Sequence, residues 1–512
     1  MDKKKDLKKF FLSRPEMHNL SKNKIEELNK LYASVYTKKF HFINEAFAVG
    51  VLSRSITKII DAKIVNDYYP YFKNTDKITI AKSSNDLWHL IDNNNLFNSI
   101  NNILKEKKLG EFVFDYKIFD HNKKYKNLKI YFLSLIINKF FNLFREKVLF
   151  EVINIKLFIK TLFKKKSPQF FVQEKYNLVT NSYYNSKIRK KIFDDLITKF
   201  SEDLINYKNI NIQDIYVTIS LLPINLVENF SDIYFYIKNK ENNKIKRIVV
   251  SHMMKDDLVN FWIINQKINI NAKLDIWQHG AGFFFMEYDS TLNTEIEVAD
   301  TLYTWSKINS DKIKQIHLNR HIKHNFNAEN DLLVITSDWQ RFDRFNSGPI
   351  FELIQRNLNE QIIFLKNITF TKKIKVKQPP NIYNNFFQYY KENNLQNYVT
   401  NENIYKLMES NKISICTYFG STFFELMSND KPFIIFTRIS EYSFNNKAKK
   451  YIKKLKKFNC WHNSGLAASN FLNKNYKDYL DTWSQKEFRE FREDFKSNFC
   501  MKPGNWQKKL LD

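Results

Sequence analysis

A histidine placed between an apolar run and two glycines is the feature of the chain best suited to chemistry. The apolar run at 274–277 is followed by Gln278, His279, Gly280, Ala281 and Gly282. An imidazole at a strand end can act as a general base or as a donor to an anionic leaving group. We therefore take His279 and Gln278 as candidate catalytic residues. The alternative is a strand-end histidine that hydrogen-bonds to the backbone.

The glycines of this motif carry their own information. The chain has only 8 glycines in 512 residues, where about 7% is usual. Where glycine is so rare, each glycine is expected at a position that needs a tight turn or a close approach of the backbone to a ligand. Gly280 and Gly282 are therefore candidate ligand-binding residues.

A second motif has the pattern of strand, glycine turn and helix. An apolar run at 413–416 leads to Gly420, and a helix is expected to follow at 421–428. The amides at a helix N-terminus, together with the helix dipole, suit a phosphate. The predicted phosphate-binding residues are Gly420, Ser421 and Thr422, and Glu425 could accept a hydrogen bond from a ribose or sugar hydroxyl. The alternative is an ordinary capping box made by Thr422 and Glu425.

Two further candidates follow strands of the same predicted half. Lysines alternate along 372–377 before two prolines, and Lys377 at the strand end could reach a diphosphate as a point charge. The alternative is an edge strand protected by its lysines. Thr336 follows the apolar run 332–335 and suits the first strand-to-helix turn of a nucleotide-binding half.

Two clusters of basic or metal-ligating residues are weaker signals. His317, His321 and His324 recur at helical spacing, but basic residues surround them and no carboxylate lies among them, so we predict no metal site. Seven lysines at 447–457 form a basic helix. Its simplest interpretation is a solvated face, and contact with a membrane or a polyanion is the alternative.

Composition limits the function classes. A hydrophobic fraction of 43% excludes a disordered chain, and 3 scattered cysteines give no disulfide framework. We expect a cytoplasmic protein with neither a signal sequence nor a transmembrane segment. The 82 Lys and Arg against 54 Asp and Glu give a net charge of +28. This surplus indicates nucleic acid, an anionic membrane or a phosphorylated substrate as partner, unless it reflects an AT-rich genome.

The coarse pattern predicts an α/β protein of two Rossmann-like doubly wound domains that face a cleft, with a helix-rich N-terminal region. Strands are expected at 215–221, 245–251, 274–278, 302–305, 332–336, 362–365, 374–376, 413–416 and 433–436, and helices at 256–266, 350–357 and 421–428. The aromatic and basic stretch 127–163 is expected to form a buried helical hairpin, with a membrane-surface segment as the alternative. The predicted parts are 1–212, helix-rich; 213–325, the rest of the acceptor-side domain; 326–460, the nucleotide-sugar-binding domain; and 461–512, helices that pack back across the domains.

Taken together, these stretches resemble a known group of proteins. The residues that carry the resemblance are Leu222-Pro223, Glu228-Asn229-Phe230, Trp277 to Gly280 with Gly282, Asp300, Leu302 to Trp305, Gly420 to Thr422, Glu425-Leu426, Lys431-Pro432, Ala467-Ala468, Asp478, Trp483 and Phe495. The chain resembles transferases of bacterial surface-carbohydrate loci, including those for lipopolysaccharide and capsule, which have the glycosyltransferase B fold. It is more distantly similar to glycerophosphotransferases of teichoic-acid synthesis and to keto-sugar transferases of capsule initiation.

The resemblance implies a metal-independent glycosyltransferase without a cofactor. The donor nucleotide sugar would bind the C-terminal half, and His279 from the other half would face the reacting centre. The acceptor would be a glycan or a lipid-linked sugar, with the enzyme at the inner face of the cytoplasmic membrane. The alternatives are a keto-sugar or glycerol-phosphate transferase of the same architecture, or a basic non-enzymatic protein that binds nucleic acid or serves as a scaffold.

Overall fold

In the computed structural model, part of the chain is described. The described residues are 14–68, 78–83, 86–87, 90, 95–105, 109, 116–119, 147–150, 167–170, 183–241, 243–251, 257–278, 280, 282–287, 289–317, 321–322, 328, 330–336, 351–371, 373–378 and 386–504. The chain divides into two compact units, one of residues 1–277 with 290–302 and one of residues 278–289 with 303–512.

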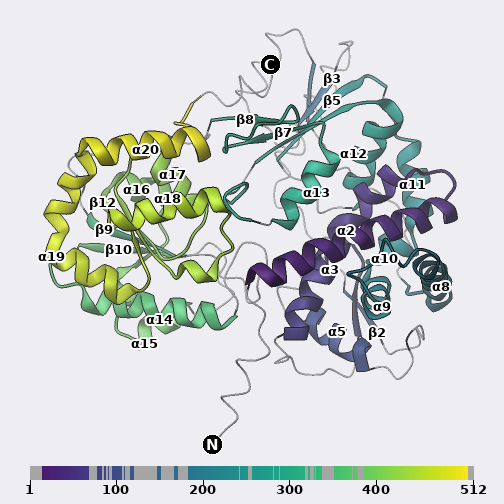
Figure 1. The fold of residues 1–512 in the computed structure, drawn as a ribbon, viewed down its shortest axis with the longest axis horizontal. Coiled ribbons are helices and arrows are strands. Elements are labelled where there is room, and N and C mark those ends of the chain that lie inside the picture. The colour runs from purple at the N-terminus through teal and green to yellow at the C-terminus, as the bar shows by residue number, and fades with distance from the viewer. Residues whose placement is uncertain are drawn as a thin grey trace, which may run out of the picture. The chain divides into compact units, whose positions relative to one another are not determined.

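Unit 1 combines helices with parallel strands (Figure 1). Its helices are α2 (Arg14–Lys39), α3 (Glu45–Tyr68), α5 (Asn95–Lys105), α8 (Ser186–Glu202), α9 (Ile212–Leu221), α10 (Ile224–Val227), α11 (Phe230–Lys238), α12 (Asp257–Ile270) and α13 (Ser290–Val298). Its strands are β1 (Ile78–Ala81), β2 (Tyr116–Phe119), β3 (Lys147–Phe150), β4 (Ser167–Phe170), β5 (Ile245–Val250), β6 (Lys273–Trp277) and the start of β7 (Thr301–Thr304). The main sheet has the order β4-β3-β5-β6-β7-β8, where β8 is Ile313–Gln315, and β1 and β2 form a separate parallel pair.

Buried ion pairs join the helices of unit 1. The Asp214 carboxylate at the start of α9 accepts from Lys24 of α2 and lies 3.2 Å from Lys63 Nζ of α3. Arg189 of α8, fully buried, donates from Nε and Nη2 to Glu228. Since breaking a buried pair leaves an uncompensated charge, these contacts fix how the helices pack.

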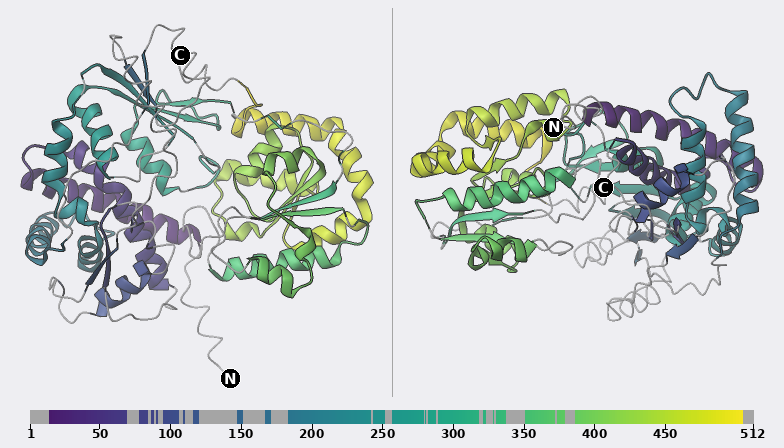
Figure 2. Two further views of the ribbon diagram at one scale, coloured as in Figure 1. Left: turned by 180° about the vertical axis from the view of Figure 1, so that it is seen from behind. Right: turned by 90° about the horizontal axis from the view of Figure 1, so that it is seen from below.

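Unit 2 has a six-stranded sheet in the order β11-β10-β9-β12-β13-β14, with helices on both of its faces (Figure 2). Its strands are β9 (Asn330–Ile335), β10 (Ile374–Lys377), β11 (Val399–Thr400), β12 (Asn411–Cys416), β13 (Phe433–Phe436) and β14 (Trp461–His462), and all five pairings are parallel. Its helices are α14 (Phe351–Asn367), α15 (Phe386–Glu392), η3 (Gln396–Tyr398), α16 (Ile404–Glu409), α17 (Ser421–Ser428), η4 (Ile439–Glu441), α18 (Asn446–Lys457), α19 (Gly465–Ser484) and α20 (Lys486–Phe499). Counted along the unit, the strand order is 3-2-1-4-5-6, which is that of a Rossmann domain.

The predicted fold class, α/β with two largely parallel sheets and a helical N-terminal region, is confirmed, but two predicted strands are wrong. The stretch predicted as a strand at 215–221 belongs to α9. Asn211 and Asp214 form a capping box there, and burial all round the helix hides the helical period. The stretch at 362–365 lies inside α14. Most of the hairpin predicted at 127–163 lies outside the described residues; within it, β3 is a strand.

The Gln278–Gly282 motif was expected in the first half, whereas residues 278–289 belong to unit 2. The reason is hydrophobic. Phe285 is fully buried, and its ring lies 5.1 Å from that of Phe419 and 4.7 Å from that of Phe499. Met286 forms an antiparallel bridge with Phe444. Burial of aromatic surface thus holds this loop on unit 2.

Candidate functional site

The end of β12 lies at the switch point of the unit 2 sheet. In the 3-2-1-4-5-6 order, β9 and β12 are neighbours from which the chain continues to opposite sides. The Thr417 backbone amide and side-chain hydroxyl both donate to Ile335 O, each at 3.2 Å. Open parallel sheets bind ligands beyond the carboxyl ends of the strands at this point. The turn at 417–420 therefore occupies the position where a ligand is expected.

α17 begins directly after this turn without a side-chain cap. Its N-cap residue is Gly420, in extended conformation, and Phe423 N donates to Gly420 O at 3.1 Å. The capping box considered for Thr422 with Glu425 therefore does not form. The positive end of a helix dipole attracts an anion, and no capping side chain bonds to this end of α17.

Tyr418 explains why residue 420 is glycine. A Cβ at Gly420 would overlap the ring of Tyr418. Residue 420 must therefore be a glycine because there is no space for a side chain. The Tyr418 hydroxyl is hydrogen-bonded to the Thr422 side chain, and burial raises the pKa of Tyr418 well above its ordinary value. The phenol therefore stays neutral and fixes the Thr422 hydroxyl, which sequence reasoning had left for a ligand.

Glu425 is half-buried on the second turn of α17. Its Oε1 accepts a hydrogen bond of 3.1 Å from the hydroxyl of Tyr405 on α16. A carboxylate oriented in this way can accept further hydrogen bonds from hydroxyl groups, since it has about four lone-pair positions. The sequence analysis assigned no role to Tyr405, which lies outside the motifs, or to Tyr418, which lies within the motif that contains Gly420.

Gln278 is a fully engaged amide within unit 2. Its Nε2 donates to Gly280 O at 2.5 Å, and its Oε1 accepts from Trp305 N at 2.9 Å. Its backbone amide donates to Tyr303 O at 2.8 Å, and the side chain is buried. These bonds give Gln278 a positioning role for the turn that follows it. His279 itself lies outside the described residues.

Gly280 brings the two glycine motifs together. A Cβ at Gly280 would lie 3.8 Å from Ser421 Oγ, the first residue of α17. Gly282 has φ +106°, a conformation that favours glycine, and its carbonyl accepts from Phe285 N and Met286 N at 3.0 Å. Gly280 thus lies beside the N-terminus of α17.

Lys377 and Thr336 end two adjacent strands of the same sheet. The Thr336 hydroxyl donates to Lys377 O at 2.6 Å, so it joins the ends of β9 and β10. Because β10 pairs with β9 on one side and β11 on the other, the edge-strand explanation for its lysines is wrong. Burial lowers the pKa of Lys377.

Sequence reasoning also missed a buried polar network beneath the turn. Asn357 of α14 donates to Thr417 O at 2.5 Å, and Gln361 donates to Thr417 Oγ1 at 3.2 Å. The Tyr390 hydroxyl donates in turn to Gln361 Oε1 at 2.7 Å. The sequence signal for this network was the pair Asn357 and Gln361, two polar residues four apart on the buried side of a helix.

The histidine cluster offers no metal site in the described part of the chain. His317 Nδ1 is hydrogen-bonded to Lys502 O at 2.9 Å, His321 is exposed and His324 lies outside the described residues. Across the described ranges, no group of three His, Cys, Asp or Glu side chains is placed to hold a metal ion. The three cysteines are free and buried.

A family profile decides the class of the protein. The profile of the LIC12162 family transferases matches residues 30–512. The chain belongs to this family. No curated protein matches this LIC12162 family transferase.

Solved structures show only distant similarity to this LIC12162 family transferase. The S. aureus MnaA–UDP structure is 8% identical with a TM-score of 0.39, covering 71% of this chain and 94% of that one. Acinetobacter baumannii MurG is 9% identical with a TM-score of 0.34, covering 72% and 98%. An S. aureus TarM variant in complex with UDP is 11% identical with a TM-score of 0.28, and the match spans 53% of this chain and 59% of TarM.

Proposed function

We propose that this transferase is a glycosyltransferase that moves a sugar from a nucleotide-sugar donor to a surface-polysaccharide or lipid-linked acceptor. The observation that carries the proposal is the α17 N-terminus: it follows the switch-point strand, lacks a side-chain cap and has Gly280 beside it. Such a terminus can hold the diphosphate of a donor.

Each residue of the site would have its own role in binding the donor or in catalysis. The donor diphosphate would lie on the amides of Ser421 and Thr422, and Lys377 would contribute positive charge from the end of β10. Glu425 would accept a hydrogen bond from a hydroxyl of the ribose or the sugar. Amides and lysine can stabilise the leaving phosphate without a metal ion. His279 would take the proton of the acceptor hydroxyl as general base.

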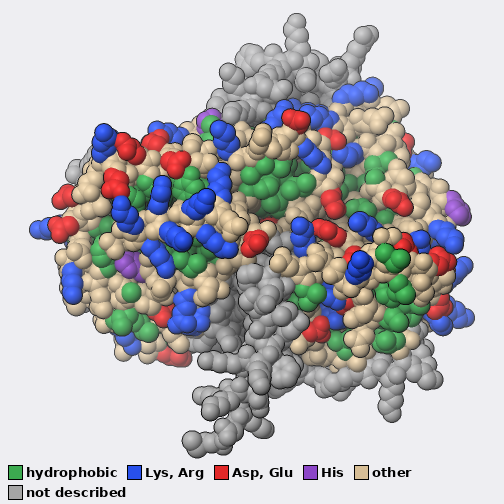
Figure 3. Space-filling view, viewed as in Figure 1, with side chains coloured by type: hydrophobic (Ala, Val, Ile, Leu, Met, Phe, Trp, Pro, Cys, Tyr) green, Lys and Arg blue, Asp and Glu red, His purple; other side chains and the backbone are tan. Residues whose placement is uncertain are grey.

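A basic helix offers a means of staying near a lipid-linked acceptor. The seven lysines of α18 are exposed, and Lys and Arg side chains gather over this helix (Figure 3). Its apolar residues Ala448, Ile452 and Leu455 are buried in unit 2. The helix would therefore touch an anionic leaflet by charge alone, at about 1 kcal/mol per lysine. None of the described helices has the length and apolar character needed to cross a bilayer.

Membrane contact is tested by sedimentation with vesicles. We expect binding to vesicles that contain phosphatidylglycerol, little binding to neutral phosphatidylcholine vesicles, and release at high salt. Replacing Lys449, Lys450 and Lys453 by Glu should abolish the binding. Equal binding to both vesicle types would contradict this part of the proposal.

The donor is tested by a thermal-shift panel of UDP, GDP, CDP, CMP and dTDP. A ligand that binds the folded state raises the unfolding temperature, so the nucleotide that responds identifies the base of the donor. Glu425→Ala should abolish the shift. His279→Ala should keep the shift and lose turnover of the matching nucleotide sugar. If no nucleotide shifts the wild-type protein, the proposed function is wrong.

A further inference from the structure

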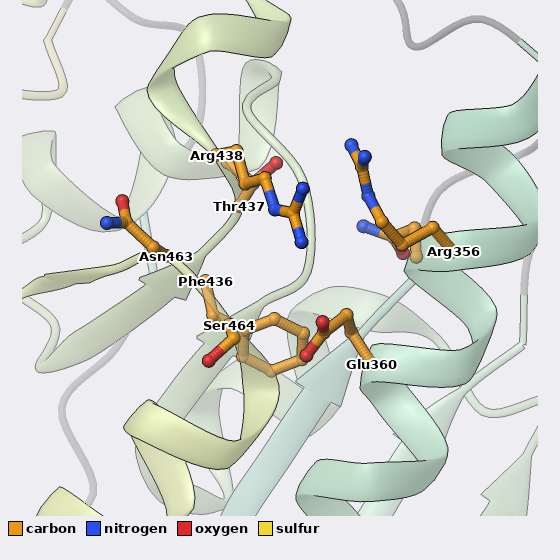
Figure 4. A pocket seen from close by; sticks show the side chains of 8 residues that line it. Arg356, Glu360, Phe436, Thr437, Arg438, Asn463 and Ser464 are labelled. Carbon is orange, nitrogen blue, oxygen red and sulfur yellow. The ribbon is translucent and has the colours of Figure 1, made fainter. Parts of the chain in front are cut away.

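A pocket lies at the same edge of the unit 2 sheet as the start of α17. It is partly open to solvent, which accounts for part of its volume of about 240 Å³, and it is lined by residues of α14, by the end of β13 and by residues that follow β13 and β14 (Figure 4). Its polar lining residues include Arg356, Glu360, Thr437, Arg438, Asn463 and Ser464. Since β13 and β14 are parallel to β12, the pocket is at the carboxyl ends of the strands, where ligands bind. The residues proposed to bind the donor, namely Lys377, Ser421, Thr422 and Glu425, are not among those that line it.

Two guanidinium groups define its chemistry. Arg356 and Arg438 extend toward one another across the pocket (Figure 4). Arg438 is exposed, and it forms no ion pair or side-chain hydrogen bond with any residue that the structure describes. Like charges held near one another repel, and an anion between them removes that cost. The fork of donors on each arginine matches the oxygens of a phosphate or a carboxylate.

A carboxylate lies on the same helix as Arg356, one turn further along α14. Glu360 Oε2 accepts from Gly465 N, the first residue of the 20-residue helix α19, at 2.7 Å. A Cβ at Gly465 would overlap the backbone oxygen of Glu360, so α14 and the start of α19 are in direct contact. The pocket therefore presents two cations and one fixed carboxylate. A ligand that carries both an oxyanion and hydroxyl groups could bind the arginines through the oxyanion and Glu360 through a hydroxyl.

We propose that this pocket is a second binding site, for a sugar that bears an oxyanion. Arg356 and Arg438 hold the phosphate or carboxylate, and Glu360 accepts from a sugar hydroxyl. Asn357, which also lines the pocket, donates to Thr417 O, so the pocket lies beside the turn that leads to α17. The proposal goes beyond the donor site and does not depend on which nucleotide the protein uses.

Calorimetric titration of the full chain tests it, with glucose 1-phosphate, glucuronate and neutral glucose as probes. Both anionic sugars should bind and glucose should not, and the tighter of the two identifies the acid group. Arg438→Gln and Arg356→Gln should each weaken the binding at least tenfold, and Arg438→Lys should weaken it less. Arg489→Gln is the matched control, because Arg489 is an exposed arginine of α20, and it should change affinity less than twofold.

The outcomes separate this site from the donor site. Absence of binding by either anionic sugar, equal binding of glucose, or unchanged affinity in Arg438→Gln would overturn the proposal. Since Arg438 is exposed, this variant should fold even if Arg356→Gln does not. Arg438→Gln should also bind the nucleotide that responds in the thermal-shift panel within twofold of wild type, and a tenfold loss would place Arg438 in the donor site instead. Failure of every nucleotide of that panel to bind, with binding of an anionic sugar intact, counts against the proposed function alone.

Discussion

Gly280 lies against Ser421, so that a Cβ at the glycine would come 3.8 Å from the serine Oγ. The two glycine motifs are far apart in the sequence, but they meet within one unit at the N-terminus of α17. Gly280, which follows His279 in the sequence, thus lies beside a helix terminus suited to a phosphate.

The two glycines should respond differently to substitution by alanine. At Gly420 the new methyl group would overlap the Tyr418 ring, so the free energy of unfolding should fall by about 1–3 kcal/mol. At Gly280 the nearest atom lies at ordinary contact distance, and the change should stay within about 0.5 kcal/mol. Denaturant unfolding of both variants measures the difference. Equal losses would mean that Tyr418 does not set the requirement at residue 420.

Gln278→Ala should loosen the turn that carries His279. The substitution leaves Trp305 N and Gly280 O without their partner, which costs about 1–3 kcal/mol for a buried group. Hydrogen exchange at Trp305 should therefore become faster. Gln485→Ala serves as the control, since Gln485 is exposed and its side chain makes no capping bond. Unchanged exchange at Trp305 would remove the positioning role from Gln278.

Lys377 should give nucleotide binding a pH dependence. Burial lowers the pKa of Lys377, so the free protein loses this charge at a lower pH than an ordinary lysine would. Because only the ammonium attracts a diphosphate, affinity should fall as pH rises through that lowered pKa. Lys377→Arg should remove the fall, because arginine stays protonated. Lys375→Gln, on the same strand, should keep the wild-type pH dependence of nucleotide affinity. If this variant loses the pH dependence, Lys375 and not Lys377 is its source.

Glu425 and Tyr405 should act as an ordered pair. Glu425→Ala should weaken binding of the responding nucleotide at least tenfold, which corresponds to about 1.4 kcal/mol of binding free energy. Tyr405→Phe removes only the hydrogen bond that orients the carboxylate, so a smaller loss of about 0.5–1.5 kcal/mol is expected. Titration calorimetry compares the variants, with the exposed Glu490→Ala as control. A larger effect from Tyr405 than from Glu425 would rule out direct contact by the carboxylate.

The sequence predicts unit 2 better than unit 1. The helix expected at 421–428 agrees with α17, because a buried strand, a glycine and a helix pattern follow one another without ambiguity. The stretch 215–221 misled because every one of its residues is buried, and β-branched residues then indicate a strand as readily as a helix. The strand propensity of these β-branched residues did not prevent the helix, which begins at the capping box of Asn211 and Asp214.

The assignment of the histidine loop required tertiary information. Three phenylalanines follow Gly282, but only the structure shows that Phe285 packs among the aromatic rings of unit 2. The same holds for Arg356 and Arg438, which are far apart along the chain and meet at one pocket. Spacing along a sequence carries no signal for such a pair.

Hydrogen exchange with and without the responding nucleotide tests most directly whether a donor binds at the start of α17. We expect the nucleotide to slow exchange in peptides covering residues 417–425, and Glu425→Ala to remove this protection. Protection confined to unit 1, with no change at 417–425, would contradict it.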